Sequence, residues 1–284
     1  MPLDPHQLVS LKFPDSVRSY TEKDVMLYAL GIGLGHDPMG RRELAFVYEN
    51  GLRVLPTFAC VLGFEPFLLR DTGVNFAMIV HGEEHLTLHR PLASSATIVA
   101  KHFIDDVIDK GAGKGALLLM RRVISDRATG ETIATIRQVV FCRGDGGFGA
   151  VRPSPPVRLL PERAPDLTCD LPTRSDMALL YRLSGDVNPL HADPDVAKAA
   201  GFPRPILQGL GTFGVAGHAV LRSVCDDNPS RLAAIAGRFS APVFPGETLR
   251  TEIWRDGEVV SFRTRVVERG VVAINNGRAV VQVT

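Results

Sequence analysis

The sequence lacks an excess of charge of either sign and lacks a long apolar run. Its 284 residues include 32 Lys and Arg against 31 Asp and Glu. This balance removes the electrostatic argument for nucleic-acid binding, which needs a basic surface. A membrane-spanning helix needs about 18 consecutive apolar residues, and even the apolar stretch 206–221 is interrupted by Gln, Thr, His and glycines. We therefore expect neither nucleic acid nor a membrane as a partner.

The sequence also has few cysteines and no Cys-x-x-Cys pair. The four are scattered along the chain, at Cys60, Cys142, Cys169 and Cys225. This pattern favours small buried hydrophobic residues in a reducing compartment over a disulfide framework or a zinc site. The first residues lack the basic and then apolar pattern of a signal peptide, and the last four, Val-Gln-Val-Thr, are not a peroxisomal Ser-Lys-Leu signal. We expect a cytoplasmic protein.

Prolines concentrate near the middle of the chain. Six of them lie in the stretch 144–172, at positions 153, 155, 156, 161, 165 and 172, and this stretch has no hydrophobic periodicity. Such a composition is typical of an extended linker. The sequence therefore predicts a first domain over 1–150, a Pro-rich linker over 151–172 and a second domain over 173–284.

The two halves of the chain repeat each other at a nearly constant offset. Thr21-Glu-Lys-Asp24 matches Thr173-Arg-Ser-Asp176, and each start has the Thr and acid of a helix N-terminal signature. Segment 56–58 matches 211–213, and 90–92 matches 244–246. The offsets, 152 to 155 residues, indicate a gene duplication with few insertions.

Each half contains a helical opening, an apolar helix rich in Gly and Ala, and β-branched runs. In the second half the runs are 249–254, 259–267 and 271–283, and short glycine turns that favour antiparallel strands separate them. The apolar helix over 207–221 has no polar stripe, so it must be enclosed on most sides. The sequence predicts an α+β fold of the double hotdog type. In this fold two curved antiparallel sheets lie side by side, each wrapped around a central helix.

Polar residues that could perform chemistry are densest in Ser184-Gly-Asp-Val-Asn-Pro-Leu-His-Ala-Asp193. Gly185 can end the preceding helix in a left-handed conformation, and Pro189 prevents its continuation. Asp186, Asn188 and His191 then lie on a stiff loop and can converge on one water. Hydration of an activated double bond needs one group to accept a proton from water and one to donate a proton to carbon.

A hydrogen-bond donor for a reacting carbonyl is predicted shortly after this loop. Phe202-Pro-Arg-Pro-Ile-Leu-Gln-Gly209 leads into the apolar helix, so the Gly209 N–H lies at a helix N-terminus. There it is free of an intrahelical partner and lies at the positive end of the helix dipole. Such a donor can stabilise the enolate-like oxygen of a thioester.

Non-catalytic interpretations of these residues remain open. Asp-x-Asn-Pro often forms a hydrogen-bonded turn, and a single His is commonly structural. A metal site made of Asp186, His191 and Asp193 would lack a further spaced ligand. His81, His85 and His89 have a regular spacing, but an even spacing only places side chains on one face of a strand. We expect no metal.

Long motifs of the chain resemble the MaoC-like hydratase 2 family, which includes the hydratase 2 part of peroxisomal multifunctional enzyme type 2. The most specific are Tyr181-Arg-Leu-Ser-Gly-Asp-Val-Asn-Pro-Leu-His191 and Gly201-Phe-Pro-Arg-Pro-Ile-Leu-Gln-Gly-Leu-Gly-Thr-Phe-Gly214. Shorter matches cover most of the first half: Tyr28-Ala-Leu-Gly31, Phe46-Val-Tyr-Glu49, Leu55-Pro-Thr-Phe58, Val80-His-Gly-Glu83, Asp109-Lys-Gly111 and Gly146-Gly-Phe-Gly149. The fold of this family is a double hotdog.

The resemblance implies roles for individual residues. Asp186 and His191 are implied as the catalytic pair, Asn188 as a residue that holds the water, and Gly209 as the oxyanion donor. Contacts with acyl-CoA are implied for four further residues, His81, Gly82, Lys110 and Phe239. Tyr28 and Glu49 match polar family positions whose role is less clear. The chain departs from the family at Gln208, where relatives usually have His, and we expect this change to tune the site.

The resemblance predicts reversible hydration of trans-2-enoyl-CoA to (3R)-3-hydroxyacyl-CoA, as in fatty-acid β-oxidation, by a lyase without cofactor. Coenzyme A enters as part of the substrate. The first half has no Asp-x-Asn-Pro-x-x-His, so we expect it to help form the acyl tunnel. Two alternatives are a hotdog acyl-CoA thioesterase and a non-catalytic acyl-CoA-binding protein. By analogy with other double hotdog chains, we expect a homodimer.

Overall fold

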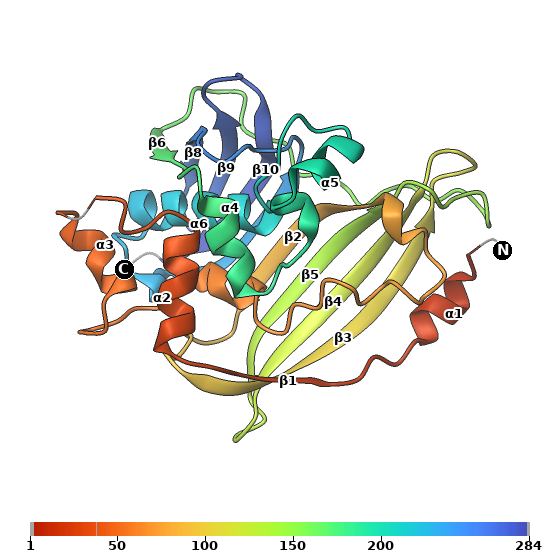
Figure 1. Ribbon diagram of the computed structural model, residues 1–284, viewed down its shortest axis with the longest axis horizontal. Helices are drawn as coiled ribbons and strands as arrows, with labels where there is room; N and C mark the ends of the chain where they lie inside the picture. The colour runs from red at the N-terminus through yellow and green to blue at the C-terminus, as the bar shows by residue number, and fades with distance from the viewer. Residues whose placement is uncertain (1–2, 38, 283–284) are drawn as a thin grey trace.

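The computed structural model describes residues 3–37 and 39–282, and its centre is a sheet of ten antiparallel strands (Figure 1). The first half contributes β1 (Ser16–Tyr20), β2 (Ile79–Leu88), β3 (Ala96–Asp109), β4 (Ala116–Asp126) and β5 (Thr132–Cys142). The second half contributes β6 (Leu167–Pro172), β7 (Leu232–Phe239), β8 (Thr248–Asp256), β9 (Val259–Val266) and β10 (Val272–Val281). The expected strands of the second half are confirmed, although residue 283 of the last one lies outside the described residues.

The strand order is symmetric about its middle. It runs β1-β3-β4-β5-β2-β7-β10-β9-β8-β6, so each strand of the first half mirrors the strand five places later in the chain. The two half-sheets join where β2 pairs with β7, from Glu83 opposite Arg238 to Thr87 opposite Ala234. We call this pairing the β2–β7 seam. The predicted double hotdog is confirmed, and its symmetry supports the duplication inferred from the sequence.

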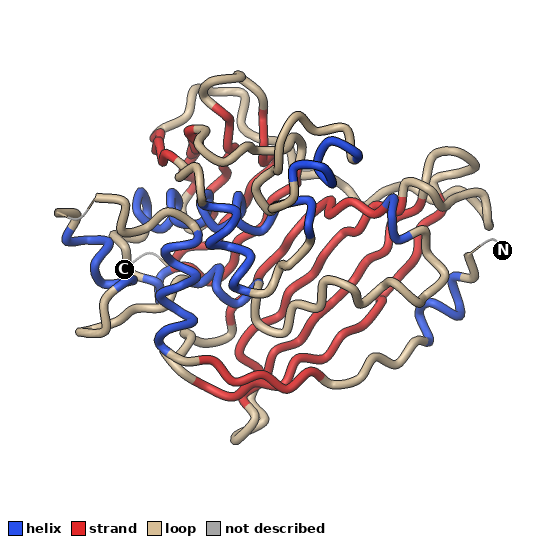
Figure 2. The backbone as a smooth tube through the Cα atoms, in the orientation of Figure 1, coloured by secondary structure: helices blue, strands red, loops and turns tan. Residues whose placement is uncertain are grey.

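The helices gather on one face of the sheet (Figure 2). The α-helices are α1 (Pro5–Ser10), α2 (Glu22–Gly31), α3 (Arg41–Val47), α4 (Met177–Tyr181), α5 (Pro194–Ala199) and α6 (Gly209–Val224). Short 3₁₀ helices are η1 (Pro56–Cys60), η2 (Phe76–Met78), η3 (Arg182–Ser184), η4 (Pro189–His191) and η5 (Pro229–Arg231). No helix within residues 3–37 and 39–282 is long and apolar enough to cross a membrane.

Helix α6 is enclosed, as its lack of a polar stripe predicts. Thirteen of its 16 residues are buried, and it packs against strands of the second half and against η1. Its glycines permit close approach. A Cβ on Gly217 would lie 2.6 Å from the Thr57 methyl of η1, and one on Gly214 would lie 2.8 Å from the Tyr28 hydroxyl. These contacts tie the long helix of the second half to the first half.

The first half differs from the expectation of a central helix in each half. Its counterpart of α6 is η1, and a loop follows it across the face of β3–β5 (Figure 2). Leu69 and Val74 of that loop pack in a second hydrophobic core with residues of the three strands. Gly63 has a φ of +62° just after η1, and Pro66 follows, so the chain cannot continue as a helix.

The end of the predicted linker is part of the sheet. Leu167–Pro172 forms the edge strand β6 and pairs with β8, from Leu167 opposite Ile253. The extended stretch between the halves is therefore shorter than 151–172. Thr173 does not cap α4 as its sequence pattern suggests, because its hydroxyl donates to the carbonyl of Glu247. Three of the four cysteines are buried and Cys169 is half-buried, all as free thiols.

The buried His218 of α6 predicts a loss of stability in acid. Burial, and secondarily Arg222, lowers the pKa of His218 to about 4. The unfolded chain therefore binds an extra proton between an ordinary histidine pKa of about 6.5 and this value. We expect this residue to lower the free energy of unfolding by about 3 kcal/mol as the pH falls across that window. Urea unfolding at several pH values measures it. His218→Gln should flatten the dependence, whereas exposed His89→Gln should not, and equal slopes in all three proteins would contradict the assignment.

Candidate active site

The loop that carries Asp186 and His191 is held by its own hydrogen bonds. Gly185 ends η3 with a φ of +121°, as predicted. The Asn188 N–H donates to Asp186 Oδ1 over 3.3 Å, and Asn188 Oδ1 accepts from the Leu190 N–H over 3.0 Å. The turn expected from Asp-x-Asn-Pro is therefore present, and the Asn188 side chain stabilises it from an exposed position. A contact of Asn188 with water remains a prediction.

His191 lies beside Asp186 in a nearly buried position. Its Nε2 is 3.7 Å from Asp186 Oδ2, and the two side chains are 9% and 14% exposed. Its Nδ1 is 2.9 Å from the Ile206 carbonyl, which can only accept, so Nδ1 carries the hydrogen. The neutral ring then presents the Nε2 lone pair next to the carboxylate. The gap exceeds a hydrogen bond, so one oxygen atom can contact both groups.

The Gly209 N–H lies at the start of α6, shortly after the backbone carbonyl that binds His191. Ile206, which binds His191, precedes Gly209 by three residues, so one short segment positions both. Among the described residues the Gly209 N–H has no acceptor. The N-terminus of the helix makes this donor attractive to negative charge. The segment is anchored by buried Gln208, whose Nε2 donates to the Ala178 carbonyl over 3.0 Å.

Phe239 connects Gly209 with the predicted acyl-CoA contacts at the β2–β7 seam. A Cβ on Gly209 would lie 3.5 Å from the Phe239 ring. The same ring lies 4.8 Å from the imidazole of His81, centroid to centroid. Gly82 follows His81 at a shift in the β2–β5 register, where a Cβ would lie 2.9 Å from the Val139 carbonyl. Only glycine permits that close approach.

A groove of about 210 Å³ begins at this point. We call it the Gly82 groove, and its lining includes Gly82, Phe239, Arg238, Ser154 and Pro155. The Lys110 Nζ donates to Ser154 Oγ over 2.8 Å, which places its ammonium group beside the groove. The structure thus brings His81, Gly82, Lys110 and Phe239 together along one path.

Tyr28 and Glu49 lie elsewhere. Tyr28 is 1% exposed and packs against Phe58 and Tyr181 in the core behind the loop. Burial raises the pKa of its hydroxyl well above the usual value, so it stays protonated. Glu49 is exposed in the turn after α3, and its side chain makes no hydrogen bond within the described part of the chain. Their roles remain predictions.

The regularly spaced histidines bind different side chains. His81 lies 2.9 Å from Glu84, His85 lies 3.0 Å from Glu83, and His89 lies 2.9 Å from the Thr135 hydroxyl. Across residues 3–37 and 39–282 no three His, Cys, Asp or Glu side chains are placed to hold a metal ion.

Two groups at the site were not predicted. The Ile206 carbonyl orients His191, and the buried Glu84 carboxylate holds His81. A backbone carbonyl leaves no signal in a sequence. Glu84 follows Val80-His-Gly-Glu83 directly, but a strand would place positions 81 and 84 on opposite faces. The register shift at Gly82 brings them together.

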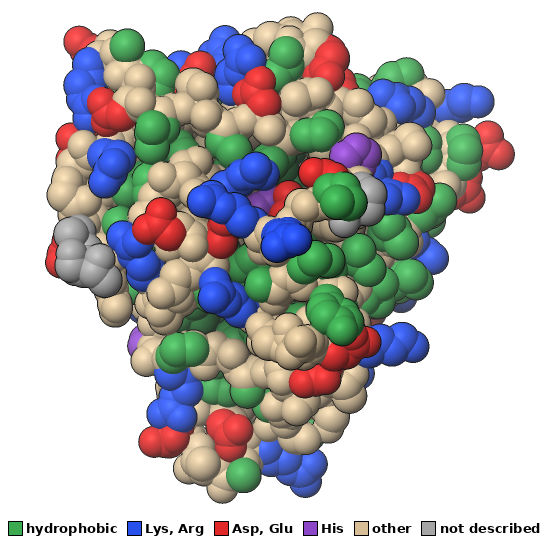
Figure 3. All heavy atoms as spheres, turned by 90° about the vertical axis from the view of Figure 1, so that its left-hand side faces the viewer, with side chains coloured by type: hydrophobic (Ala, Val, Ile, Leu, Met, Phe, Trp, Pro, Cys, Tyr) green, Lys and Arg blue, Asp and Glu red, His purple; other side chains and the backbone are tan. Residues whose placement is uncertain are grey.

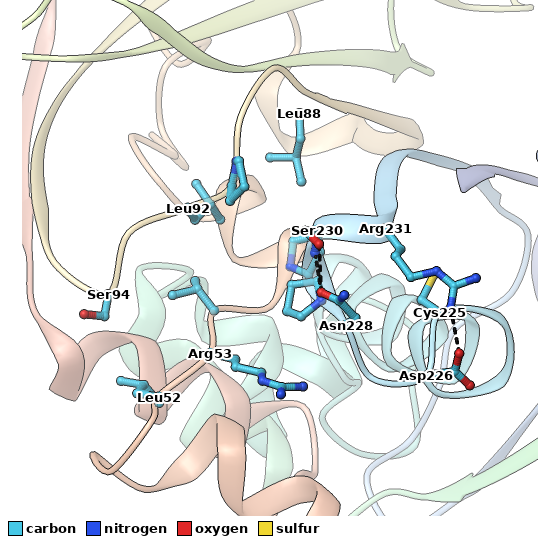
Figure 4. Close-up of a pocket in the computed structure, with 14 residues that line it drawn as sticks. Leu52, Arg53, Leu88, Leu92, Ser94, Cys225, Asp226, Asn228, Ser230 and Arg231 are labelled. Carbon is cyan, nitrogen blue, oxygen red and sulfur yellow. Dashed lines mark hydrogen bonds and ion pairs between the residues drawn. The ribbon is translucent and has the colours of Figure 1, made fainter. Parts of the chain in front are cut away.

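A larger cavity, of about 630 Å³, lies at the other end of α6 (Figure 4). Its polar side chains bind one another: Arg231 pairs with Asp226 and Ser230 with Asn228. Neither Asp186 nor His191 lines it. Near this end of the helix Arg222 pairs with Glu43 of α3. Seen from the α3 side, acidic and basic side chains are interspersed on the surface (Figure 3). We therefore place the candidate site at the N-terminal end of α6.

The hydrogen bond to Ile206 predicts the tautomer of His191. In its neutral form the ring should carry hydrogen on Nδ1 and leave Nε2 free, because a carbonyl cannot donate. The ¹⁵N chemical shifts of the two ring nitrogens in labelled protein measure this directly. A neutral His191 with hydrogen on Nε2 would show that the Ile206 contact does not orient the ring.

Comparisons with known proteins identify two matching family models. Residues 19–144 match the MFE-2 hydratase 2 N-terminal domain, and residues 157–277 match the MaoC like domain. The chain is 41% identical to peroxisomal enoyl-CoA hydratase 2 of Arabidopsis thaliana, over 92% of this chain and 90% of that protein. It is 39% identical to peroxisomal multifunctional enzyme type 2 of Mus musculus, over 94% of this chain but 37% of that protein.

A solved structure agrees with these matches. The MaoC-like dehydratase of Phytophthora capsici superposes with a TM-score of 0.87 at 33% identity, over 98% of this chain and 99% of that one. The similarity extends over both halves of the sheet and includes the region of the Asp186–His191 loop. The chain therefore belongs to the MaoC-like hydratase 2 family.

Proposed function

We propose that the chain reversibly adds water to a trans-2-enoyl-CoA and forms a (3R)-3-hydroxyacyl-CoA in fatty-acid or related acyl-CoA metabolism. The observation that carries this proposal is the Asp186–His191 pair, whose histidine binds the Ile206 carbonyl three residues before the Gly209 N–H at the start of α6. The names of two relatives, enoyl-CoA hydratase 2 and peroxisomal multifunctional enzyme type 2, support the same reaction class. The enzyme is then a hydro-lyase.

The geometry supports a simple proton path. A water held between Asp186 and His191 loses a proton to this pair as its oxygen attacks C3 of the enoyl group. The electrons of the double bond shift toward the thioester, whose oxygen becomes negative and is stabilised by the Gly209 N–H. The same pair returns the proton to C2. Because one pair serves both steps, H and OH add to the same face of the double bond.

We propose that the CoA portion of the substrate binds along the Gly82 groove. Lys110, beside Ser154, provides positive charge for a CoA phosphate, and Phe239 and His81 lie between this groove and Gly209. The acyl chain then extends to the side of the first half, where a loop rather than a long helix covers the sheet. We propose that this face forms the acyl tunnel.

Replacement of the catalytic pair should abolish most of the turnover. Asp186→Asn and His191→Gln should each lower kcat by about 100-fold or more, the usual size of general acid–base effects. Asp195→Asn, an exposed carboxylate in the first turn of α5, is the matched control and should retain activity. Loss of enoyl absorbance from crotonyl-CoA measures the rate. Near-normal activity in both site variants would refute the assignment.

Thiol release in the same assay separates the rival functions. Hydration removes the enoyl absorbance and leaves the thioester intact, so we expect no free CoA. Stoichiometric thiol release, with no hydroxyacyl product, would instead identify a thioesterase. Tight binding of enoyl-CoA without turnover at any chain length would identify a binding protein.

The oligomeric state, compartment and cofactor remain proposals. We propose a homodimer, which mass measurement in solution tests, and a cytoplasmic location, which cell fractionation tests. Two of the similar proteins are named peroxisomal, so the peroxisomal fraction is the informative comparison. We propose that no cofactor is needed, and activity that survives dialysis against a chelator would support this.

A further inference from the structure

Glu84 is a fully buried carboxylate on β2, directly behind the groove. Its exposure is 0%. Its Oε2 accepts hydrogen bonds from His81 Nε2 and from Gln138 Nε2, both over 2.9 Å. A buried carboxylate is unfavourable unless donors and a positive charge compensate for lost hydration. The fold therefore buries a charged group at a cost in stability. This group binds His81, a residue of the predicted acyl-CoA path.

Two carboxylates, those of Glu83 and Glu84, lie near His81, and it is the Glu84 carboxylate that binds its imidazole. Buried Arg122 on β4 faces Glu84, and this carboxylate partly offsets the lowering of the Arg122 pKa by burial. The other nearby carboxylate, Glu83, is held by Arg238 over 2.6 Å and by His85 over 3.0 Å. These partners lower the pKa of Glu83. Glu83 offers only its backbone carbonyl to His81, over 3.2 Å.

The hydrogen bonds determine which nitrogen of His81 is free. Both neighbours of Nε2, the Glu84 carboxylate and the Glu83 carbonyl, are acceptors, so Nε2 carries a hydrogen. Nδ1 is then the nitrogen left for a ligand. The side chain is 25% exposed and its ring lies against Phe239, which also lies close to Gly209.

We propose that Glu84 is a positioning residue that holds the His81 ring so that its Nδ1 hydrogen-bonds to an amide group of the pantetheine arm of CoA. The half of the chain without the Asp186–His191 loop thereby supplies its own histidine–carboxylate pair, His81–Glu84, to the same site. This inference rests on the proposed acyl-CoA substrate. It concerns binding of the CoA portion, whereas Asp186 and His191 act on the acyl double bond.

The inference predicts a specific kinetic pattern. Glu84→Gln keeps the size of the side chain but replaces a carboxylate acceptor for His81 Nε2 by a weaker amide acceptor, and His81→Ala removes the ring. Each should raise KM for an enoyl-CoA about tenfold or more, the effect of losing a hydrogen bond, while kcat changes much less. In the double variant, Glu84→Gln should add nothing to the effect of His81→Ala, because Glu84 acts through His81. Glu65→Gln, which removes a carboxylate paired with Arg18, is the control and should leave KM unchanged.

A purely structural role for Glu84 gives a different result. Glu84→Gln would then raise KM by the same factor with and without His81, or would lower kcat and thermal stability with KM unchanged. Either outcome overturns the proposal. Unchanged KM in His81→Ala also overturns it, and this variant answers the question even if Glu84→Gln does not fold.

Calorimetric binding of butyryl-CoA, which has no double bond to hydrate, separates this inference from the proposed function. A roughly tenfold weaker Kd in both single variants, the size set by one hydrogen bond, would support the inference even if no enoyl-CoA were hydrated. An unchanged Kd beside normal hydration would overturn the inference and leave the proposed function intact.

Discussion

The pairing of β2 with β7 is the constraint on which the site depends. This seam joins two half-sheets that would each otherwise end in an open edge. It also brings His81 and Gly82 from one half against Phe239 from the other, next to the start of α6. A slip of one residue would turn every side chain of the seam to the opposite face. The groove and the helix N-terminus would then no longer meet at Phe239.

The burial of α6 leaves polar groups at its two ends, and these ends differ. An enclosed helix must satisfy or use the polar groups at its two ends. At the C-terminal end, a cavity is lined by the pairs Arg231–Asp226 and Ser230–Asn228. At the N-terminal end, the Gly209 N–H has no acceptor within the described part of the chain, and the preceding Ile206 carbonyl binds His191. The described part of the first half has no comparable helix, and a loop covers its sheet instead. The duplicated halves have therefore diverged, and in the proposed function one half carries the acid–base pair while the other contacts the substrate.

Much of this arrangement could be predicted from the sequence because its signals are local. Glycine turns and β-branched runs identified β8 to β10, and the apolar stretch before Leu221 identified α6. The Asp-x-Asn-Pro turn predicted a loop that would place Asp186 near His191. What could not be predicted depends on partners distant in the chain. Strand β6 forms from a proline-rich stretch because β8 offers an edge. Glu84 reaches His81 only because of the register shift at Gly82.

Both halves contribute a histidine beside a carboxylate, and His191 of the second half binds the segment that leads into α6. That asymmetry makes the stereochemistry of the reaction the most direct test of the account. Chiral analysis of the 3-hydroxyacyl-CoA formed from a trans-2-enoyl-CoA should find the (3R) product, because Asp186 and His191 deliver water from one fixed side of the bound thioester. A (3S) product would contradict the assignment of this site.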